Sequence, residues 1–456
     1  KLFLTSHDTI VAIATPAGVG GIGVVRLSGN DIKKFMLAIL GEEIQPRLAC
    51  YKQFLGAEGE CLDTGIALYF SGPNSFTGQA ILELQGHGGS VVQDLLLQRC
   101  IELGARMARP GEFSERAFLN NKLDLAQAEA VADLIEAASV QAAKSAVRSM
   151  CGDFSKEIKN LVNSLKDVRV FVEASIDFPD EEIEFLPDPV LLKTIDDIKV
   201  KLGDIINKAR HGVLLRDGLT IVLAGRPNAG KSSLLNCLVG NDEAIVTTEA
   251  GTTRDVLRKT AVINDIPLQL IDTAGLRETT SIVEKEGIRR AWSEIEAADH
   301  VLFVADASDV SATNIKKVWP EFFKKFPESS ASLTLVLNKI DLTDLTPGEM
   351  INTEPTFCIS AKHRTGINNL VNYLLKQAGQ LDRGHGAFSA RGRHVAALKS
   401  AWSHVSSGKQ QLIECGSGEL IAEDLRQAQN SLSEITGNIT SDELLGEIFS
   451  SFCIGK

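Results

Sequence analysis

One stretch near the middle of the chain constrains its fold more than any other: GRPNAGKSS, between the apolar run TIVLAG and the helical run SLLNCLVG. It matches the pattern G-x-x-x-x-G-K-[ST] through Gly225, Gly230, Lys231 and Ser232. In a strand-loop-helix setting the glycines let backbone N–H groups surround phosphates, the lysine reaches the outer phosphates and the hydroxyl binds magnesium. The stretch therefore predicts a mainly parallel α/β sheet with a phosphate-binding loop at the carboxyl end of one strand.

Four further motifs follow in the order that a GTP-binding module requires. GTTRD offers Thr253 as the second magnesium ligand, and DTAG places Asp272 behind the metal and Gly275 near the last phosphate. In NKID, the carboxylate of Asp341 can accept two hydrogen bonds from the N1 and N2 edge of guanine, which adenine does not present. In SAK, the backbone of Ala361 can donate to the guanine O6. The set predicts GTP as the nucleotide.

The residues expected around GTP are Asn228, Ala229, Gly230, Lys231, Ser232, Ser233, Thr247, Thr248, Glu249, Ala250, Gly251, Thr252, Thr253, Asp272, Thr273, Ala274, Gly275, Asn338, Lys339, Asp341, Ser360, Ala361 and Lys362. The magnesium ligands among them are the hydroxyls of Ser232 and Thr253.

The segment DTAGLRE carries Leu276 where well-known switches carry a glutamine that orients the attacking water. Leucine cannot form that hydrogen bond, so either hydrolysis is slow or the polarising groups come from elsewhere. Carboxylates at Glu278, Glu284 and Glu286 lie nearby in the sequence, and the residues alone do not choose among them.

The types of residue that follow one another along the sequence predict three kinds of domain. Residues 1–120 mix short β-branched runs with glycine turns, as in an N-terminal α/β domain, and residues 121–217 are helical. Residues 218–379 alternate strands with helices, and residues 380–456 are helical again. Neither helical flank is large enough for a comfortable core, so we expect one all-helical domain with the GTPase module inserted into it. The last helix of the first flank is expected to end near Gly212.

The composition limits which partners the protein is expected to bind and in which cellular compartment it is expected to lie. A formal charge of −12 opposes indiscriminate binding to nucleic acid, so an RNA partner must meet a local basic patch or a second protein. Eight cysteines without a C-x-x-C pair favour reduced thiols that are mostly buried. No apolar run approaches the length of a membrane span. The sequence predicts a cytoplasmic protein with no membrane or DNA partner.

A literal G-x-G-x-x-G occurs at Gly18, Gly20 and Gly23. A dinucleotide site needs a helix after this pattern, whereas GVVRLSG is β-branched and predicts a strand. We therefore expect glycines in a tight turn and no dinucleotide bound here.

The motifs GRPNAGKSSLLN, AGTTRD and DTAGLRE, together with GEFSERAFLNNKLDLAQAE, ELQGHGG and the terminal FCIGK, resemble the MnmE (TrmE) family of GTPases. The resemblance covers essentially the whole chain. It implies a homodimer that works with the FAD-dependent protein MnmG. Together they would add an aminomethyl or carboxymethylaminomethyl group to C5 of wobble uridine 34 in certain tRNAs, with glycine or ammonia as nitrogen donor.

The resemblance also implies that potassium replaces the missing glutamine. Its ligands would be Asn228, Thr247, Glu249 and Thr252, and Glu284 would activate the water. Catalytic roles at Lys231, Asp272 and Cys453 follow from the same resemblance.

By resemblance, the N-terminal domain binds 5,10-methylenetetrahydrofolate, with 5-formyltetrahydrofolate as an analogue, through Arg26, Glu83, Lys122 and Lys456. The terminal segment is expected to fold toward this pocket. The stretch SFTGQA carries Gln79 and Ala80 where the family usually has an acidic pair.

A rival hypothesis is a regulatory GTPase that acts in ribosome or RNA assembly and modifies nothing. Such a switch would be expected to carry a basic RNA-binding appendage, whereas this chain is acidic. Nucleoside analysis of tRNA would separate the two hypotheses.

Overall fold

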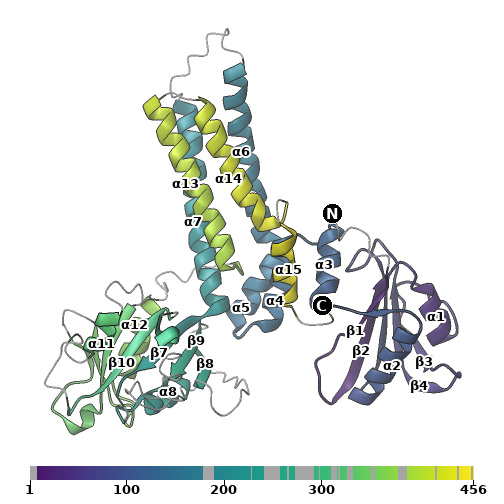
Figure 1. Ribbon diagram of the computed structural model, residues 1–456, viewed down its shortest axis with the longest axis horizontal. Helices are drawn as coiled ribbons and strands as arrows, with labels where there is room; N and C mark the ends of the chain where they lie inside the picture. The colour runs from purple at the N-terminus through teal and green to yellow at the C-terminus, as the bar shows by residue number, and fades with distance from the viewer. Residues whose placement is uncertain are drawn as a thin grey trace. The chain divides into compact units, whose positions relative to one another are not determined.

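The computed structural model describes residues 8–177, 189–226, 228–240, 257–263, 266–272, 292–296, 298–309, 316, 319–325, 332–350, 355–377, 388–415, 418–438, 441–452 and 455 (Figure 1). The chain forms two compact units. The first comprises Lys1–Ile135, Val147–Ile205 and Ala396–Lys456, and the second comprises Glu136–Ala146 and Ile206–Val395.

A six-stranded sheet in the order β3-β4-β5-β2-β1-β6 begins the first unit. Its strands are β1 (Ile10–Ile13), β2 (Gly20–Gly29), β3 (Cys50–Leu55), β4 (Cys61–Phe70), β5 (Ala80–Gly88) and β6 (Arg106–Met107). All neighbours are antiparallel except β1 and β6.

Side chains of the sheet alternate between its two faces, as the strand period of two requires. On one face, Val25, Leu27, Leu82 and Leu84 are buried in a core with residues of α1 (Lys33–Leu40) and α2 (Ser90–Glu102). On the other face, Phe113 of α3 (Glu112–Leu119) packs with residues of β1.

The segment that follows the G-x-G-x-x-G pattern is a strand, as predicted. Gly18 has φ +136°, and β2 begins at Gly20. A Cβ at Gly88 of β5 would lie 2.4 Å from the Gly20 carbonyl oxygen, so glycine permits the two strands to approach here. The predicted tight turn is wrong for Gly20 and Gly23, because both lie within β2.

The helices that follow begin with α4 (Leu125–Glu136), α5 (Val140–Met150) and α6 (Asp153–Asp177), and continue with α7 (Pro189–Asp217), α13 (Gly392–Cys415), α14 (Gly418–Thr436) and α15 (Asp442–Ser450). Long helices α6, α7, α13 and α14 lie side by side (Figure 1). The predicted apolar stripe of α6 is confirmed, because all its members are buried: Ile158, Leu161, Leu165, Val168 and Val172. This helix packs on α14, whose Ile421, Leu425 and Leu432 are also buried.

The predicted end of α7 near Gly212 is wrong, because the helix continues to Asp217. A Cβ at Gly212 would lie 1.8 Å from the Phe388 carbonyl oxygen. The glycine therefore allows another part of the chain to pass close to the helix and does not mark its end.

The second unit contains the predicted mainly parallel sheet, in the order β12-β13-β11-β10-β7-β9-β8. Its strands are β7 (Leu219–Ala224), β8 (Leu257–Ile263), β9 (Ile266–Asp272), β10 (His300–Asp306), β11 (Ser332–Asn338), β12 (Gly348–Met350) and β13 (Thr356–Cys358). Only the edge strands β8 and β12 are antiparallel to their neighbours.

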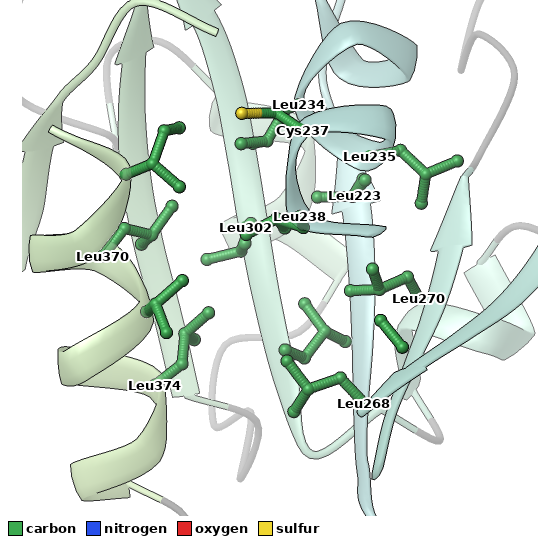
Figure 2. Close-up of a cluster of buried hydrophobic side chains, with 14 of the residues drawn as sticks. Leu223, Leu234, Leu235, Cys237, Leu238, Leu268, Leu270, Leu302, Leu370 and Leu374 are labelled. Atoms are coloured by element: carbon green, nitrogen blue, oxygen red, sulfur yellow. The ribbon is translucent and has the colours of Figure 1, made fainter. Parts of the chain in front are cut away.

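Helices of the second unit cover both faces of this sheet. Leucines of β7, β9 and β10 pack against those of α8 (Lys231–Val239) and α12 (Ile367–Gln377), as Figure 2 shows. On the opposite face, Phe303 packs with Trp319 and with Phe322 of α11 (Pro320–Lys325). Among the helices that the structure describes, none combines the length and apolarity needed to cross a membrane.

Candidate functional site: a nucleotide loop and a polar sheet face

The phosphate-binding loop joins β7 to α8, and two glycines determine its path. Gly225 has φ +140° and Gly230 has φ +94°, a region that disfavours other residues. A Cβ at Gly225 would lie 2.1 Å from the Val304 carbonyl oxygen, and one at Gly230 would lie 2.1 Å from Nδ2 of Asn338. Only glycine lets the loop pass this closely to β10 and β11.

Lys231 begins α8 and is held inside the loop. Its Nζ donates to the carbonyl oxygens of Gly225 at 2.9 Å and Arg226 at 3.1 Å. The ammonium group therefore lies among the loop's backbone groups, where a bound phosphate chain would meet it. Ser232 follows in the first turn of α8, which places its hydroxyl at the same helix start.

The guanine-reading motifs are joined by Asn338 at the end of β11. Its Nδ2 donates to the carbonyl oxygen of Ala229 at 3.0 Å, and its Oδ1 accepts from the backbone N–H of Ala361 at 3.0 Å. One amide thus fixes the phosphate loop and the SAK segment relative to each other. Lys339, at φ +66°, forms an ion pair of 2.6 Å with Asp306.

Asp341 is held ready to accept hydrogen bonds from a base. The Ser360 hydroxyl donates to its Oδ1 at 2.6 Å, and this bond holds the pKa of Asp341 below its usual range. An ionised carboxylate is acceptor-only, which matches the two N–H groups of guanine.

Several predicted residues of the nucleotide site lie outside the described residues: Glu278, Glu284, Glu286, Leu276, the segment 247–253 and the segment 273–275. The backbone of Asp272 ends β9 opposite Leu223 of β7, the strand that leads into the phosphate loop. Asn228 lies within that loop at φ +64°.

A second polar site lies on the first unit, on the sheet face opposite α1 and α2. Arg26 of β2 and Glu83 of β5 oppose each other and form an ion pair of 2.8 Å. Their side chains are 27% and 15% exposed, so small polar groups can reach them. Glu83 also accepts from Nε2 of Gln85 at 3.2 Å, and Arg26 lies over the ring of Phe113.

The end of the chain reaches this site. The Gly455 carbonyl oxygen accepts from Nη1 of Arg26 at 3.4 Å. Gly455 is buried at φ +93°, and a Cβ there would lie 2.5 Å from the Ile13 carbonyl oxygen. Its neighbours Cys453 and Lys456 lie outside the described residues.

Lys122 lies beside the loop that precedes β5. A Cβ at Gly78 would lie 3.4 Å from Cε of Lys122, and Asn120 donates to the Thr77 carbonyl oxygen at 2.7 Å. The structure therefore brings Arg26 and Glu83 together and places Lys122 against the adjoining loop.

Sequence reasoning missed a buried charge network next to that loop. Arg116 donates to Glu112 at 3.0 Å, to Asp8 at 2.9 Å and to the side-chain carbonyl of Gln79 at 2.8 Å. The neutral Gln79 therefore still accepts from this arginine. Bonds from Arg106, Arg109 and Arg116 to Glu112 outweigh its burial, which alone would raise its pKa, and hold that pKa below the usual value. The only signal in the sequence was the GEFSER motif.

Two protein-family models together match most of this chain. The family model "GTP-binding protein TrmE N-terminus" matches residues 9–122, and "MnmE helical domain" matches residues 125–453. Proteins of Erwinia tasmaniensis and Yersinia pseudotuberculosis, each named tRNA modification GTPase MnmE, are both 54% identical over 455 residues, which is 99% of this chain and 100% of theirs.

Two solved structures are similar to part of this chain. The Era protein of Aquifex aeolicus bound to GDP and AlF4⁻ is 25% identical over 41% of this chain and 66% of its own, with a TM-score of 0.28. The G domain of the T. maritima FeoB iron transporter is 26% identical over 35% of this chain and 98% of its own, with a TM-score of 0.26. The whole-length relatives and the two family models show that this chain belongs to the MnmE (TrmE) family of tRNA modification GTPases.

Proposed function

We propose that this chain is a potassium-dependent GTPase that forms a homodimer and works with an FAD-dependent partner of the MnmG type. Together they add an aminomethyl or carboxymethylaminomethyl group to C5 of uridine 34 in certain tRNAs. The observation that supports this most is the second polar site: Arg26 and Glu83 form a reachable pair that the end of the chain contacts. A GTPase that acts only as an assembly switch has no need of such a site.

In the nucleotide site, Ser232 and Thr253 supply hydroxyls for magnesium, and Lys231 contacts the outer phosphates. These residues fit a bound phosphate chain and its magnesium ion. The two glycines of the loop leave no room for side chains, so its backbone can surround the phosphates. Potassium held by Asn228, Thr247, Glu249 and Thr252 supplies the positive charge that an arginine finger brings to other GTPases. Glu284 orients the water in place of the glutamine that Leu276 replaces.

In the first unit, Arg26, Glu83, Lys122 and Lys456 bind 5,10-methylenetetrahydrofolate, which supplies the one-carbon unit. The site fits such a ligand, because Glu83 can accept from ring N–H groups and the cations suit an anionic glutamate tail. The partly exposed Arg26–Glu83 pair is open to such contacts. We assign Cys453 to this chemistry because Gly455, two positions later in the sequence, contacts Arg26.

The test is nucleoside analysis of tRNA from a strain that lacks the chain and is complemented with variants. Wild type should restore the modified wobble uridine, whereas Arg26→Ala and a chain shortened by residues 453–456 should not. Both purified variants should hydrolyse GTP at the wild-type rate. Normal wobble uridines in the strain without the chain would refute the proposal.

A further inference from the structure

The β4–β5 loop, residues 71–79, is held in place where it approaches β5. The hydroxyl groups of Thr77 and Ser28 lie 2.7 Å apart, at hydrogen-bond distance, and both residues are fully buried. Ser28 belongs to β2, so this bond ties the loop to the sheet. The Thr77 carbonyl oxygen also accepts from Nδ2 of Asn120 at 2.7 Å, which ties the loop to the turn that follows α3.

Gln79 connects the same loop to the buried charges of α3. Its side-chain carbonyl accepts from Nη1 of Arg116 at 2.8 Å. The charged network behind this bond contains three arginines and three carboxylates: Arg106, Arg109, Arg116, Asp8, Glu112 and Glu115. The neutral amide of Gln79 adds an acceptor to this balanced set without adding a charge. The network therefore holds the loop without making it negative.

Gly78, between these two anchored residues, lies against the turn that carries Lys122. Gly78 has φ +78°, and a Cβ there would lie 2.9 Å from Cβ of Asn120 and 3.4 Å from Cε of Lys122. The backbone N–H of Lys122 donates to the Ala117 carbonyl oxygen at 2.8 Å, so the turn is itself fixed to α3. The exposed side chain of Lys122 thus passes close to the loop backbone. A shift of the loop would therefore change where the ammonium group lies.

The anchored loop adjoins the sheet face on which Arg26 and Glu83 meet. Arg26 and Ser28 are two positions apart on β2, so their side chains point to the same face. Arg26 also lies over the ring of Phe113, which belongs to α3, the helix that carries Arg116. The contacts that hold the loop and those that hold Arg26 therefore come from the same strand and the same helix.

We propose that Gln79 and Arg116 are positioning residues of the folate site, which act through the β4–β5 loop to hold Lys122 for the anionic glutamate tail. This rests on the function proposed above, in which Lys122 is one of the cations that bind the folate. A free lysine side chain loses rotamer entropy when a ligand fixes it. A loop that restrains the side chain beforehand lowers this cost of binding. Loss of the bond between Arg116 and Gln79 releases the loop and with it the side chain of Lys122.

The first test measures the affinity of the full-length chain for 5-formyltetrahydrofolate by titration calorimetry. Gln79→Met keeps the length of the side chain but removes the carbonyl that Arg116 contacts, and it should weaken binding by on the order of tenfold. Gln79→Glu keeps an acceptor for Arg116 and should bind as the wild type does. The matched control is Gln53→Met, because Gln53 is exposed on β3 of the same sheet, and this variant should also keep the wild-type affinity. Wild-type affinity of Gln79→Met would overturn the proposal.

A double-mutant cycle tests whether Gln79 acts through Lys122. Lys122→Ala alone should weaken folate binding, because it removes the cation. In the Lys122→Ala background, Gln79→Met should cause no further loss, since the residue that the loop positions is already absent. A purely structural effect of Gln79→Met would instead add to that of Lys122→Ala. Additive losses would therefore overturn the proposal.

Asn120→Ala provides a second variant that leaves the buried charges intact. Asn120 is exposed, and its loss releases only the Thr77 carbonyl oxygen. This variant should also weaken folate binding and should also have no further effect once Lys122 is alanine. If Gln79→Met does not fold, the cycle with Asn120→Ala decides, and additive losses or wild-type affinity there would overturn the proposal.

The wild type separates failure of this inference from failure of the proposed function. If the wild type does not bind 5-formyltetrahydrofolate, the proposed folate site fails and this inference fails with it. If the wild type binds and Lys122→Ala weakens binding, but the losses are additive, only the positioning role of Gln79 and Arg116 is wrong.

Discussion

Asn228 holds its backbone at φ +64° inside the phosphate-binding loop. Glycine tolerates this conformation, so Asn228→Gly removes the side-chain oxygen without straining the loop. Since that oxygen is a proposed ligand of potassium, we expect the variant to lose potassium-stimulated hydrolysis by on the order of 10²-fold. Initial rates of GTP turnover in potassium and in sodium chloride measure this.

Asn121 provides the matched control for this substitution. It is also left-handed, at φ +56°, but belongs to the first unit. Asn121→Gly should leave the potassium dependence unchanged. Equal rates for Asn228→Gly and wild type in both salts would remove Asn228 from the cation site.

His300 makes the second unit sensitive to acid. It is 1% exposed at the start of β10, with Nε2 2.9 Å from the Thr334 hydroxyl, and burial lowers its pKa from 6.5 to about 4. The unfolded chain binds the proton first, so stability is fully present above pH 6.5 and falls as the pH drops toward 4. The total loss is about 3 kcal/mol.

The test follows the thermal transition that GDP shifts upward, which assigns it to the second unit. His300→Gln keeps a polar partner for Thr334 but does not titrate, so its stability should fall less between pH 6.5 and 4. The same acid loss in both proteins would assign the sensitivity to other groups.

The roles of single residues could be predicted from the sequence only where the residue belongs to a local motif. NKID and SAK each follow a strand, so the sequence predicted that Asn338, Asp341 and Ala361 belong to one nucleotide site, but it did not predict the bonds that join them. Gln79 and Arg116, in contrast, are separated by 37 positions. Their contact depends on how α3 packs beside the β4–β5 loop, which no local pattern reveals.

The long helix α7 offers a direct test of how a glycine acts within an element. A Cβ at Gly212 would overlap the Phe388 carbonyl oxygen, whereas one at Gly203 of the same helix would meet nothing within 4 Å. Gly203→Ala should therefore raise stability by about 1 kcal/mol through helix propensity. Gly212→Ala should lower it by about 1–3 kcal/mol, because overpacking exceeds the same gain.

Chemical denaturation of both variants and of the wild type gives this comparison. Equal stabilisation by the two alanines would show that the close approach at Gly212 carries no energetic weight. Opposite signs would establish it as a packing contact.

Elements with a strong period were the ones that the sequence predicted well. The stripe of α6 and the buried strands of the second unit follow from spacing alone. The order of strands in the N-terminal sheet does not follow from spacing. There, β5 pairs both with β4, which precedes it directly, and with β2, which lies much earlier in the chain. The role of Gly212 within α7 also depends on its close approach to Phe388, which is far away in the sequence.

At the scale of the whole molecule, the chemistry and the GTP turnover are assigned to different units. The proposed function therefore requires that nucleotide turnover in the second unit be coupled to events on the first. Because the chain has a formal charge of −12, the tRNA must be held by a local cationic surface or by the partner protein.

A change of nucleotide specificity tests this coupling. Asp341 accepts from the N1 and N2 positions of guanine in our assignment, and Ser360 orients its carboxylate at 2.6 Å. Asp341→Asn replaces an acceptor by a donor, which suits xanthine, because xanthine carries an oxygen where guanine carries the amino group. The variant should lose GTP hydrolysis and gain hydrolysis of xanthosine triphosphate. With the partner protein and tRNA present, that nucleotide should restore modification in parallel with its hydrolysis. If modification proceeded without either nucleotide, turnover would not drive it; if xanthosine triphosphate were hydrolysed but no product formed, the base itself would have a role beyond binding.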